Sequence, residues 1–292
     1  MHDRAGFHLR YNRRERRNTM PVTPIEIELH NGIRIPLCGL DTIHLTPGTA
    51  YGGILDALER GILHIETAAE YGIETEIAKA IEDADLPRSK LFITDEIIGL
   101  KTAEATEKSA ARSMKKLGID YIDLLLMTWN GGSKEDDPKN KEVLAAWKGI
   151  EAMYKRGDAR AIGIADFLPW QVEYLLQEIE IAPMVSLICI YPGHPDIDVL
   201  ETYKEHRILP MAYLPRSIQN VIQSKEIGIL SKKHGCRNED IVLQYLVQKE
   251  CVITTMRGEN YEIRLVLSPE EMSFLDLMKD YSSSANPETD KD

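Results

Sequence analysis

Short apolar runs alternate with amphipathic stretches along most of this chain. The first two runs, residues 25–29 and 33–37, flank the pair Asn31-Gly32, which is a strong signal for a β-hairpin turn. Eight further runs have the length of strands, and stretches with the period of helices separate them. The strand-like runs lie at residues 37–40, 62–65, 91–94, 121–128, 161–164, 185–190, 209–213 and 252–255, and the helical stretches at 52–60, 74–84, 103–117, 141–155, 170–178, 197–206 and, as a double stretch, 224–248.

Strands that alternate with helices predict a parallel sheet with crossover connections. Eight such units predict a single (β/α)₈ TIM barrel of the α/β class, preceded here by an N-terminal β-hairpin, with its active site at the carboxyl ends of the strands. No break in composition, flexible linker or repeat divides residues 21–281, so we expect one barrel domain. Residues 282–292 are polar and are expected to form a disordered tail.

Composition and charge exclude several classes of protein. With 43% hydrophobic and 28% charged residues, and no apolar run of the roughly 20 residues that a membrane span needs, we expect a cytoplasmic protein without a membrane role. A net charge of −12 argues against nucleic-acid binding, because phosphate contacts need clustered Lys and Arg. Residues 1–20 differ, with six arginines against one Asp and one Glu, and are expected to be a disordered basic extension. Whether they belong to the native protein or the chain starts at Met20 stays open.

The cysteines carry no sign of a disulfide framework or a metal site. Cys38, Cys189, Cys236 and Cys251 are widely separated and form no CxxC pair. The histidines also lack the spacing of metal ligands. We therefore predict reduced thiols and no metal site built from Cys and His.

Residues 62–77, ILHIETAAEYGIETEI, bring a carboxylate, Glu66, and a phenol, Tyr71, to the expected mouth of the barrel. This stretch resembles the second-strand signature of the aldo-keto reductases. IELHNGIRIPLCGLDT resembles the hairpin and first strand of that family, RSMKKLGIDYIDLLLMTW its third helix and fourth strand, and YKRGDARAIGIADF its fifth strand. The resemblance spans about residues 25–281 and implies a barrel enzyme that reduces aldehydes or ketones with NADPH.

The resemblance also implies a catalytic tetrad of Asp, Tyr, Lys and His. In it the Tyr donates a proton to the carbonyl oxygen, the Lys lowers the pKa of the Tyr, the Asp pairs with the Lys and the His orients the substrate. Here only the tyrosine is retained, as Tyr71, while Glu66 stands at the Asp position, Glu96 at the Lys position and Thr128 at the His position. An ammonium stabilises a neighbouring phenolate, whereas a carboxylate opposes it. The ordinary reductase mechanism is therefore not expected.

The positions that hold the nicotinamide in the family are altered as well. Ala165 and Asp166 replace the Ser and Asn, and Leu187 replaces the Gln, that bind the carboxamide. Tyr213 matches the aromatic residue that stacks on the nicotinamide, and Thr42 matches a threonine near the ribose. One stacking face is thus predicted to remain, without most of the hydrogen bonds.

The segment after the last strand departs from the family in the same direction. Thr255 and Met256 replace a Lys-Ser pair that binds the 2′-phosphate, and the segment is about six residues short. Arg257 and Arg264 are partial substitutes. NADP(H) is the cofactor that the resemblance implies, but its binding is predicted to be weak or lost.

These substitutions favour a catalytically impaired family member with a binding or regulatory role, a monomer or weak oligomer whose small-molecule ligand or protein partner is unknown. Two alternatives remain: an active NAD(P)(H)-dependent oxidoreductase with a rearranged site, and a different acid–base enzyme that uses Glu66 and Glu96. With Asp41 and Asp166 these glutamates predict an acidic mouth whose carboxylates raise one another's pKa. We assign no metal to it, although Mg²⁺ and Ca²⁺ do prefer oxygen ligands.

Overall fold

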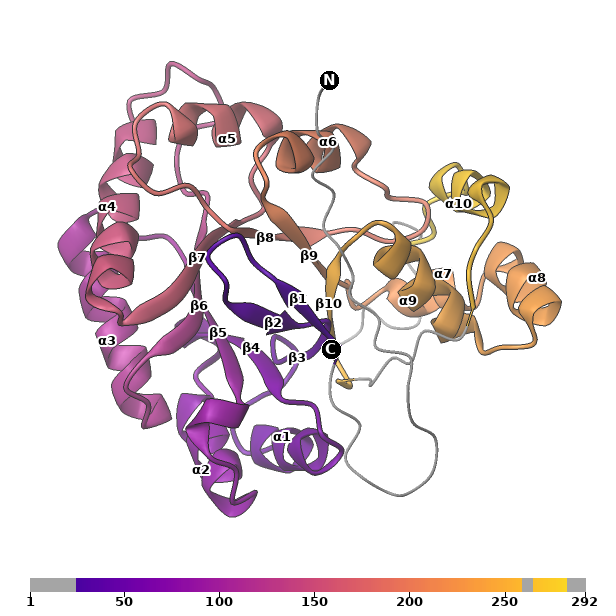
Figure 1. Ribbon diagram of the computed structural model, residues 1–292, viewed down its shortest axis with the longest axis horizontal. Helices are drawn as coiled ribbons and strands as arrows, with labels where there is room; N and C mark the ends of the chain where they lie inside the picture. The colour runs from indigo at the N-terminus through magenta and orange to yellow at the C-terminus, as the bar shows by residue number, and fades with distance from the viewer. Residues whose placement is uncertain (1–24, 259–264, 283–292) are drawn as a thin grey trace.

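Eight parallel strands of this chain close into a barrel, and helices surround most of its outer face (Figure 1). The computed structural model describes residues 25–258 and 265–282. Each strand pairs with its predecessor in the sequence and the last pairs with the first, so the sheet has no free edge. The predicted fold class and all eight strands are confirmed. The strands are β3 (Cys38–Asp41), β4 (His64–Ala68), β5 (Phe92–Ile97), β6 (Ile122–Thr128), β7 (Ala159–Ala165), β8 (Val185–Cys189), β9 (Leu209–Tyr213) and β10 (Val252–Thr255).

The helices follow the predicted amphipathic stretches and add two that were not predicted, α7 and α10. Several have caps that the sequence supplies: the Thr102 hydroxyl accepts the amide of Ala105 at the start of α3, and Gly118 ends it with φ = 67°. The helices are α1 (Ala50–Glu59), α2 (Glu74–Asp83), α3 (Ala103–Leu117), α4 (Asn140–Arg156), α5 (Pro169–Leu176), α6 (Ile197–Glu205), α7 (Ile218–Ile222), α8 (Lys225–His234), α9 (Asn238–Gln248) and α10 (Pro269–Asp276), with 3₁₀ turns η1 (Ala69–Tyr71) and η2 (Arg88–Lys90).

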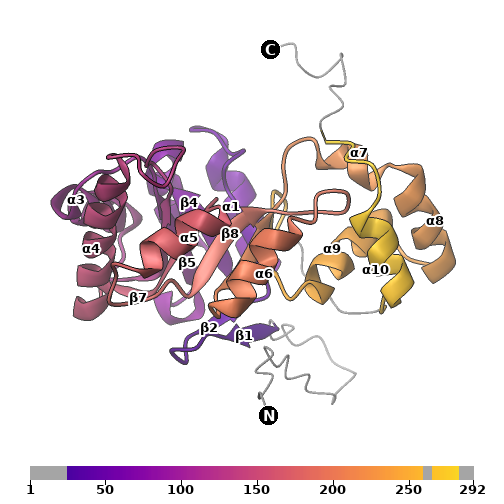
Figure 2. The same ribbon diagram turned by 90° about the horizontal axis from the view of Figure 1, so that it is seen from above.

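The predicted hairpin closes one end of the barrel (Figure 2). Its strands, β1 (Glu26–Glu28) and β2 (Arg34–Pro36), pair antiparallel. The side-chain amide of Asn31 in the turn donates to the carbonyl oxygen of Arg160 at 2.9 Å. Because Arg160 lies near the start of β7, the hairpin covers the amino ends of the strands and leaves the carboxyl ends, which we call the mouth, uncovered by it.

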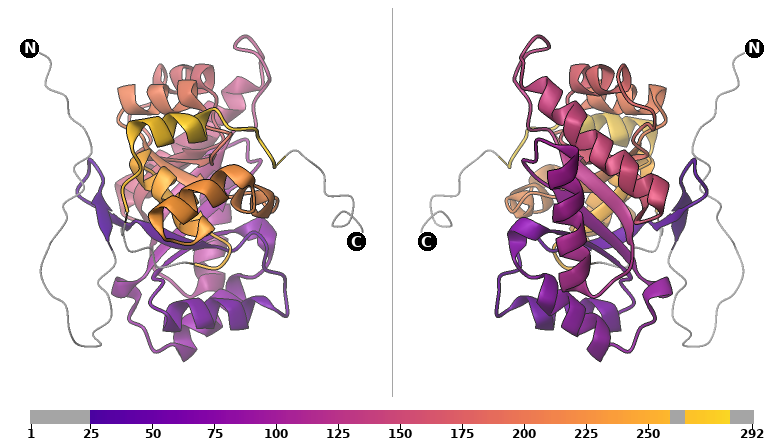
Figure 3. Two further views of the ribbon diagram at one scale, coloured as in Figure 1. Left: turned by 90° about the vertical axis from the view of Figure 1, so that its right-hand side faces the viewer. Right: turned by 90° about the vertical axis from the view of Figure 1, so that its left-hand side faces the viewer.

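The chain after β10 is described only in part, because residues 259–264 lie outside the described residues. Beyond them the chain forms α10, and in Figures 1 and 3 α10 lies on the far side of α9 from α1. There Glu271 of α10 accepts hydrogen bonds from Lys233 at 2.9 Å and His234 at 2.8 Å. The turn after β10 lies against α1, where the Arg60 guanidinium donates to the carbonyl oxygens of Arg257 (2.6 Å) and Gly258 (2.7 Å).

The other predictions about organisation are tested only in part. The thiols of all four cysteines are reduced, as predicted. Across residues 25–258 and 265–282, no helix has the length and apolar character that crossing a membrane requires. The predicted extension at residues 1–20 and Arg264 lie outside the described residues, as does the predicted tail except for Ser282. Those predictions therefore stand as predictions.

Candidate active site at the barrel mouth

The register of three strands brings the predicted catalytic carboxyls together at the mouth. Asp41 at the end of β3 lies opposite Glu66 of β4, and Glu96 of β5 lies opposite Ala68, two residues beyond Glu66. Side chains alternate along a strand, so Glu66 and Glu96 share a face. The Thr128 hydroxyl, at the end of β6, donates a hydrogen bond to Glu96. We call the carboxyls of Asp41, Glu66 and Glu96 the acidic floor.

The acidic floor is almost closed to solvent, with exposed fractions of 3% for Asp41, 2% for Glu66 and 7% for Glu96. Burial raises the pKa of Glu66 well above its ordinary value, and the charges of Asp41 and Glu96 and a hydrogen bond to Asp41 add to this effect. Burial also raises the pKa of Glu96 to about 7, although the hydrogen bond from Thr128 opposes it. The predicted mutual rise in pKa is thus present, with burial as its main cause.

Tyr71 ends the 3₁₀ turn η1 and lies half-buried above the acidic floor. Its pKa is raised, first by burial and then by the charges of Glu66 and Glu96. Among the described residues none hydrogen-bonds its hydroxyl, and no Lys or Arg forms an ion pair with either glutamate. A phenol with a raised pKa is a weaker proton donor, so the surroundings of Tyr71 oppose the role that the resemblance implies.

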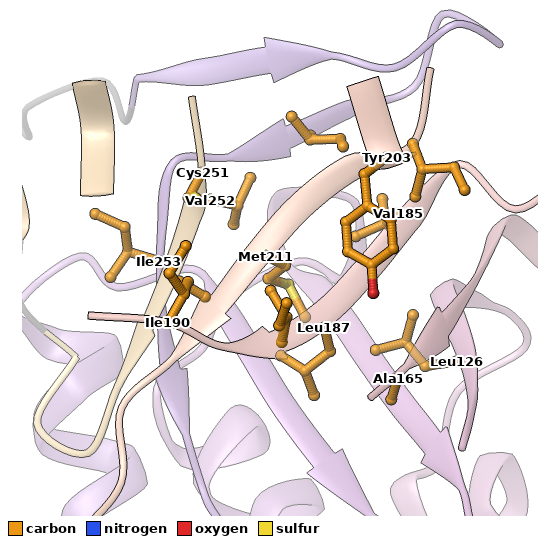
Figure 4. Close-up of a cluster of buried hydrophobic side chains, with 14 of the residues drawn as sticks. Leu126, Ala165, Val185, Leu187, Ile190, Tyr203, Met211, Cys251, Val252 and Ile253 are labelled. Atoms are coloured by element: carbon orange, nitrogen blue, oxygen red, sulfur yellow. The ribbon is translucent and has the colours of Figure 1, made fainter. Parts of the chain in front are cut away.

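Two of the positions that hold the nicotinamide in the family lie in apolar surroundings here. Figure 4 shows Ala165 and Leu187 among apolar side chains that include Leu126 and Met211. Ala165 is fully buried and Leu187 is 5% exposed, and neither side chain can donate or accept a hydrogen bond. A carboxamide placed against them would lose its hydrogen bonds to water without replacement.

Polar groups near these positions are already paired within the protein. The Thr42 hydroxyl is buried and donates to the main-chain oxygen of Glu66 at 2.8 Å. Asp166 has a left-handed backbone, φ = 55°, and accepts hydrogen bonds from the Tyr213 hydroxyl at 3.3 and 3.4 Å. The Tyr213 phenol therefore points toward a carboxylate at the site where the resemblance implies a stacking face.

Arg257, the remaining predicted cofactor residue, is not brought to the acidic floor. It lines a surface pocket of about 540 Å³ on the outer wall of the barrel, beside α1. The other lining residues are Leu40, Leu45, Gly53, Asp56, Arg60, Arg237 and Met256.

Two features beside the mouth were not assigned to the site from the sequence. Asp95, next to Glu96 but on the opposite face of β5, is 1% exposed, and burial raises its pKa to about 8 despite a hydrogen bond with Ser113. The consecutive acids Asp95-Glu96 in an apolar strand were the available signal. The second feature is an aromatic group in which Trp129, directly after β6, packs edge-on against Phe167 (5.2 Å) and Trp170 (5.3 Å).

Among residues 25–258 and 265–282, no three His, Cys, Asp or Glu side chains form a group that could hold a metal ion. The acidic floor therefore does not have the converging geometry that Mg²⁺ or Ca²⁺ needs at about 2.0 to 2.6 Å.

Comparison with known proteins agrees with the barrel fold. A model of the aldo/keto reductase family matches residues 44–217. The chain belongs to this family. It is 29% identical over 273 residues to the glyoxal reductase of Bacillus subtilis, an alignment that covers 90% of this chain and 96% of that protein.

Solved structures of aldo-keto reductases share the fold. One from a Medee basin deep-sea metagenome library is 26% identical, with a TM-score of 0.77 and coverage of 88% of this chain and 97% of that one. Another, from Bombyx mori and in complex with NADP, is 24% identical, with a TM-score of 0.75 and coverage of 87% and 92%. The family assignment made from the motifs is confirmed.

Proposed function

We propose that this aldo/keto reductase family member does not reduce carbonyl compounds through its tyrosine and instead binds a ligand in a regulatory or carrier role. Glu96 carries the proposal. Its carboxyl lies at the lysine position, is 7% exposed and is held by Thr128. After burial and Glu66, it adds to the rise in the pKa of Tyr71. Loss of a general acid or of its electrostatic partner typically costs about 10²- to 10⁴-fold in rate, and both are affected here. A cytoplasmic monomer or weak oligomer is consistent with this role.

Weak NADP(H) binding is part of the same proposal. Ala165 and Leu187 offer no hydrogen bonds, Thr42 is paired with the main chain, and Arg257 lies on the outer wall. We expect a dissociation constant for NADPH weaker than about 100 μM, or −5.5 kcal/mol. A calorimetric titration measures it, and a sub-micromolar constant would contradict the proposal. Tight NADH binding with weak NADPH binding would favour the rearranged oxidoreductase instead.

The test of catalysis compares the wild-type protein with Tyr71→Phe, using glyoxal and NADPH because the Bacillus subtilis relative is a glyoxal reductase. If the phenol does not act as the acid, the two proteins should oxidise NADPH at the same rate, and that rate should be close to the uncatalysed background. The variant removes only one hydroxyl, which none of the described residues binds, so a folding defect is not expected. A wild-type rate that falls 100-fold or more in Tyr71→Phe would establish a working reductase.

A second candidate function is acid–base catalysis by Glu66 and Glu96. The specific observation in its favour is the pair of raised pKa values, with Glu96 near 7 and Glu66 raised well above its ordinary value. Carboxyls whose pKa values are raised by burial can serve as general acids or bases near neutral pH. Turnover that is retained in Tyr71→Phe and lost in Glu96→Gln would support this candidate over the binding role.

A further inference from the structure

The acidic floor lacks the cation that buried carboxyls usually have. Among the described residues no Lys or Arg forms an ion pair with Asp41, Glu66 or Glu96. Asp41 accepts the amide of Ile43 at 2.8 Å and Glu96 accepts the Thr128 hydroxyl, but atom Oε1 of Glu66 is buried with no hydrogen-bond partner. Buried polar atoms are nearly always paired. The unpaired oxygen can therefore accept a hydrogen bond from a donor that reaches the floor of the mouth.

Three exposed apolar residues, which we call the apolar rim, follow strands at the carboxyl end of the barrel. Ile43, Ile98 and Leu168 are each within three residues of the end of a barrel strand, β3, β5 and β7 respectively. They are 45%, 37% and 51% exposed, and they are among the few large apolar side chains of the described residues that face solvent. Exposed apolar side chains at the mouth of a barrel can form part of a ligand-binding surface.

We propose that the mouth binds a primary amine, with the ammonium on the acidic floor and an apolar group of the ligand against the apolar rim. The proposal rests on the binding role proposed above and names the ligand class. An ammonium supplies three N–H donors and one positive charge, which matches an unpaired carboxyl oxygen beside two further carboxyls. Charge-assisted N–H···O bonds form at about 2.7 to 2.9 Å, so the carboxyls need not converge as closely as around a metal ion.

Binding of an amine must be coupled to release of protons. At least one carboxyl of the floor has to ionise to pair with the ammonium, and burial now favours the neutral acids. The titratable groups that act on the floor are Asp41, Glu66, Tyr71 and Glu96, with Glu70, Asp95, Asp166 and His44 around them. His44 in turn accepts a hydrogen bond from Arg216 at 2.7 Å. We therefore expect affinity to increase with pH between 6 and 8.

The experiment uses benzylamine, which is cationic in this pH range, and its neutral analogue benzyl alcohol. The full-length protein is titrated by calorimetry at pH 6 and pH 8, in phosphate and in HEPES, whose ionisation enthalpies differ. We expect benzylamine to bind at least tenfold more tightly at pH 8 than at pH 6, with a heat that depends on the buffer because protons are released. Benzyl alcohol should bind at least tenfold more weakly than benzylamine at pH 8.

Variants locate the site. Glu66→Gln should weaken benzylamine binding at least tenfold, and Glu96→Gln provides the same comparison if Glu66→Gln does not fold. Asp95→Asn is the matched control, since it also removes a buried carboxyl from the next strand but on the face toward α2 and α3. It should change the affinity far less than Glu66→Gln does.

Several outcomes would overturn the amine site: no binding at pH 8, equal binding of benzyl alcohol, equal losses in Glu66→Gln and Asp95→Asn, or stabilisation by MgCl₂ without stabilisation by benzylamine. The glyoxal assay with Tyr71→Phe separates this proposal from the one on which it rests. Amine binding in a protein that also reduces glyoxal would keep the site and remove the non-catalytic role. Absence of both activities would leave the non-catalytic role and remove the amine site.

Discussion

At the scale of single residues, two adjacent carboxyls on β5 define the unusual chemistry of this barrel. Glu96 faces the mouth and Asp95 faces α2 and α3, and both are buried. A buried carboxyl without a cation is more stable as the neutral acid, so folding raises the pKa of each. The stability of the fold therefore depends on pH through carboxyl groups that are ionised in most proteins.

The first prediction follows from the sign of that coupling. Asp95 has a folded pKa of about 8 and an unfolded pKa near 4, so the folded state holds the extra proton between these values and stability falls as pH rises through them. Buried His64 has its pKa lowered to about 3 and acts in the opposite direction, but only up to its unfolded value near 6.5. Between pH 6.5 and 8 the raised pKa values of the carboxyls therefore determine how stability changes with pH.

In urea titrations we expect the free energy of unfolding of the wild-type protein to fall over this window. Asp95→Asn should reduce the fall by up to about 1.5 kcal/mol. A variant with the same slope as the wild-type protein would show that Asp95 is ionised in the fold.

At the scale of elements, the amino end of the barrel is held by a buried ionic network rather than by apolar contacts alone. Asp123 of β6 accepts hydrogen bonds from Arg88 of η2 at 2.6 Å, from Arg160 of β7 at 2.9 Å and from the Ile93 amide of β5 at 2.9 Å. One carboxylate thus joins three neighbouring strands and the turn before them. This is the end of a barrel where such residues act in stability rather than catalysis.

The second prediction is that Asp123→Asn destabilises the protein by about 3 to 5 kcal/mol, because two guanidinium groups lose a buried counter-charge. The matched control is Glu104→Gln, which breaks an exposed ion pair of the same 2.6 Å length with Lys108 on α3. The control should have no measurable effect on the urea midpoint. Equal effects in both variants would mean that burial adds nothing to the Asp123 network.

Strands and helices could be predicted from the sequence where a single hydrophobic pattern was sufficient. All eight strands appear where apolar runs predicted them, because strands buried on both faces are nearly continuous in hydrophobicity. The short segment after β10 was recognised from the sequence, but part of it lies outside the described residues. Helix α10 was overlooked despite a sequence signal, since Ser268 and Glu271 form a capping box with Pro269 at the first turn.

The sequence predicted which residues form the site, but not which of their side chains hold a proton. Glu66, Tyr71, Glu96 and Thr128 were assigned to one mouth by resemblance, and the register of β4 and β5 with the Glu96–Thr128 hydrogen bond brings the glutamates and Thr128 together. How deeply a carboxyl is buried depends on packing from strands distant in the sequence. The dominance of burial in the raised pKa values, and the pairing of Thr42 with the main chain, therefore required the three-dimensional structure.

At the scale of the whole molecule, the barrel is closed by the hairpin at one end and carries a pocket on its outer wall beside α1. Ile27, Leu29, Ile35 and Leu37 of the hairpin belong to the buried core, and the Leu37 amide donates to the Ile25 carbonyl at 2.7 Å. The pocket of about 540 Å³ is lined by residues of α1 and of the turn after β10. Among the described residues the buried core thus begins at the hairpin.

The last prediction is that a protein starting at Met20 melts within a few degrees of the full chain. Residues 1–19 carry six arginines and few large apolar side chains, so they have little surface to bury against the core. The alternative is electrostatic docking on a chain whose net charge is −12, which would weaken as salt screens the charges. Thermal melts of both proteins at about 20 mM and 500 mM NaCl separate the two. A loss of more than about 8 °C at low salt, corresponding to roughly 2 to 4 kcal/mol for a domain of this size, that disappears at high salt would show that the extension docks on the barrel.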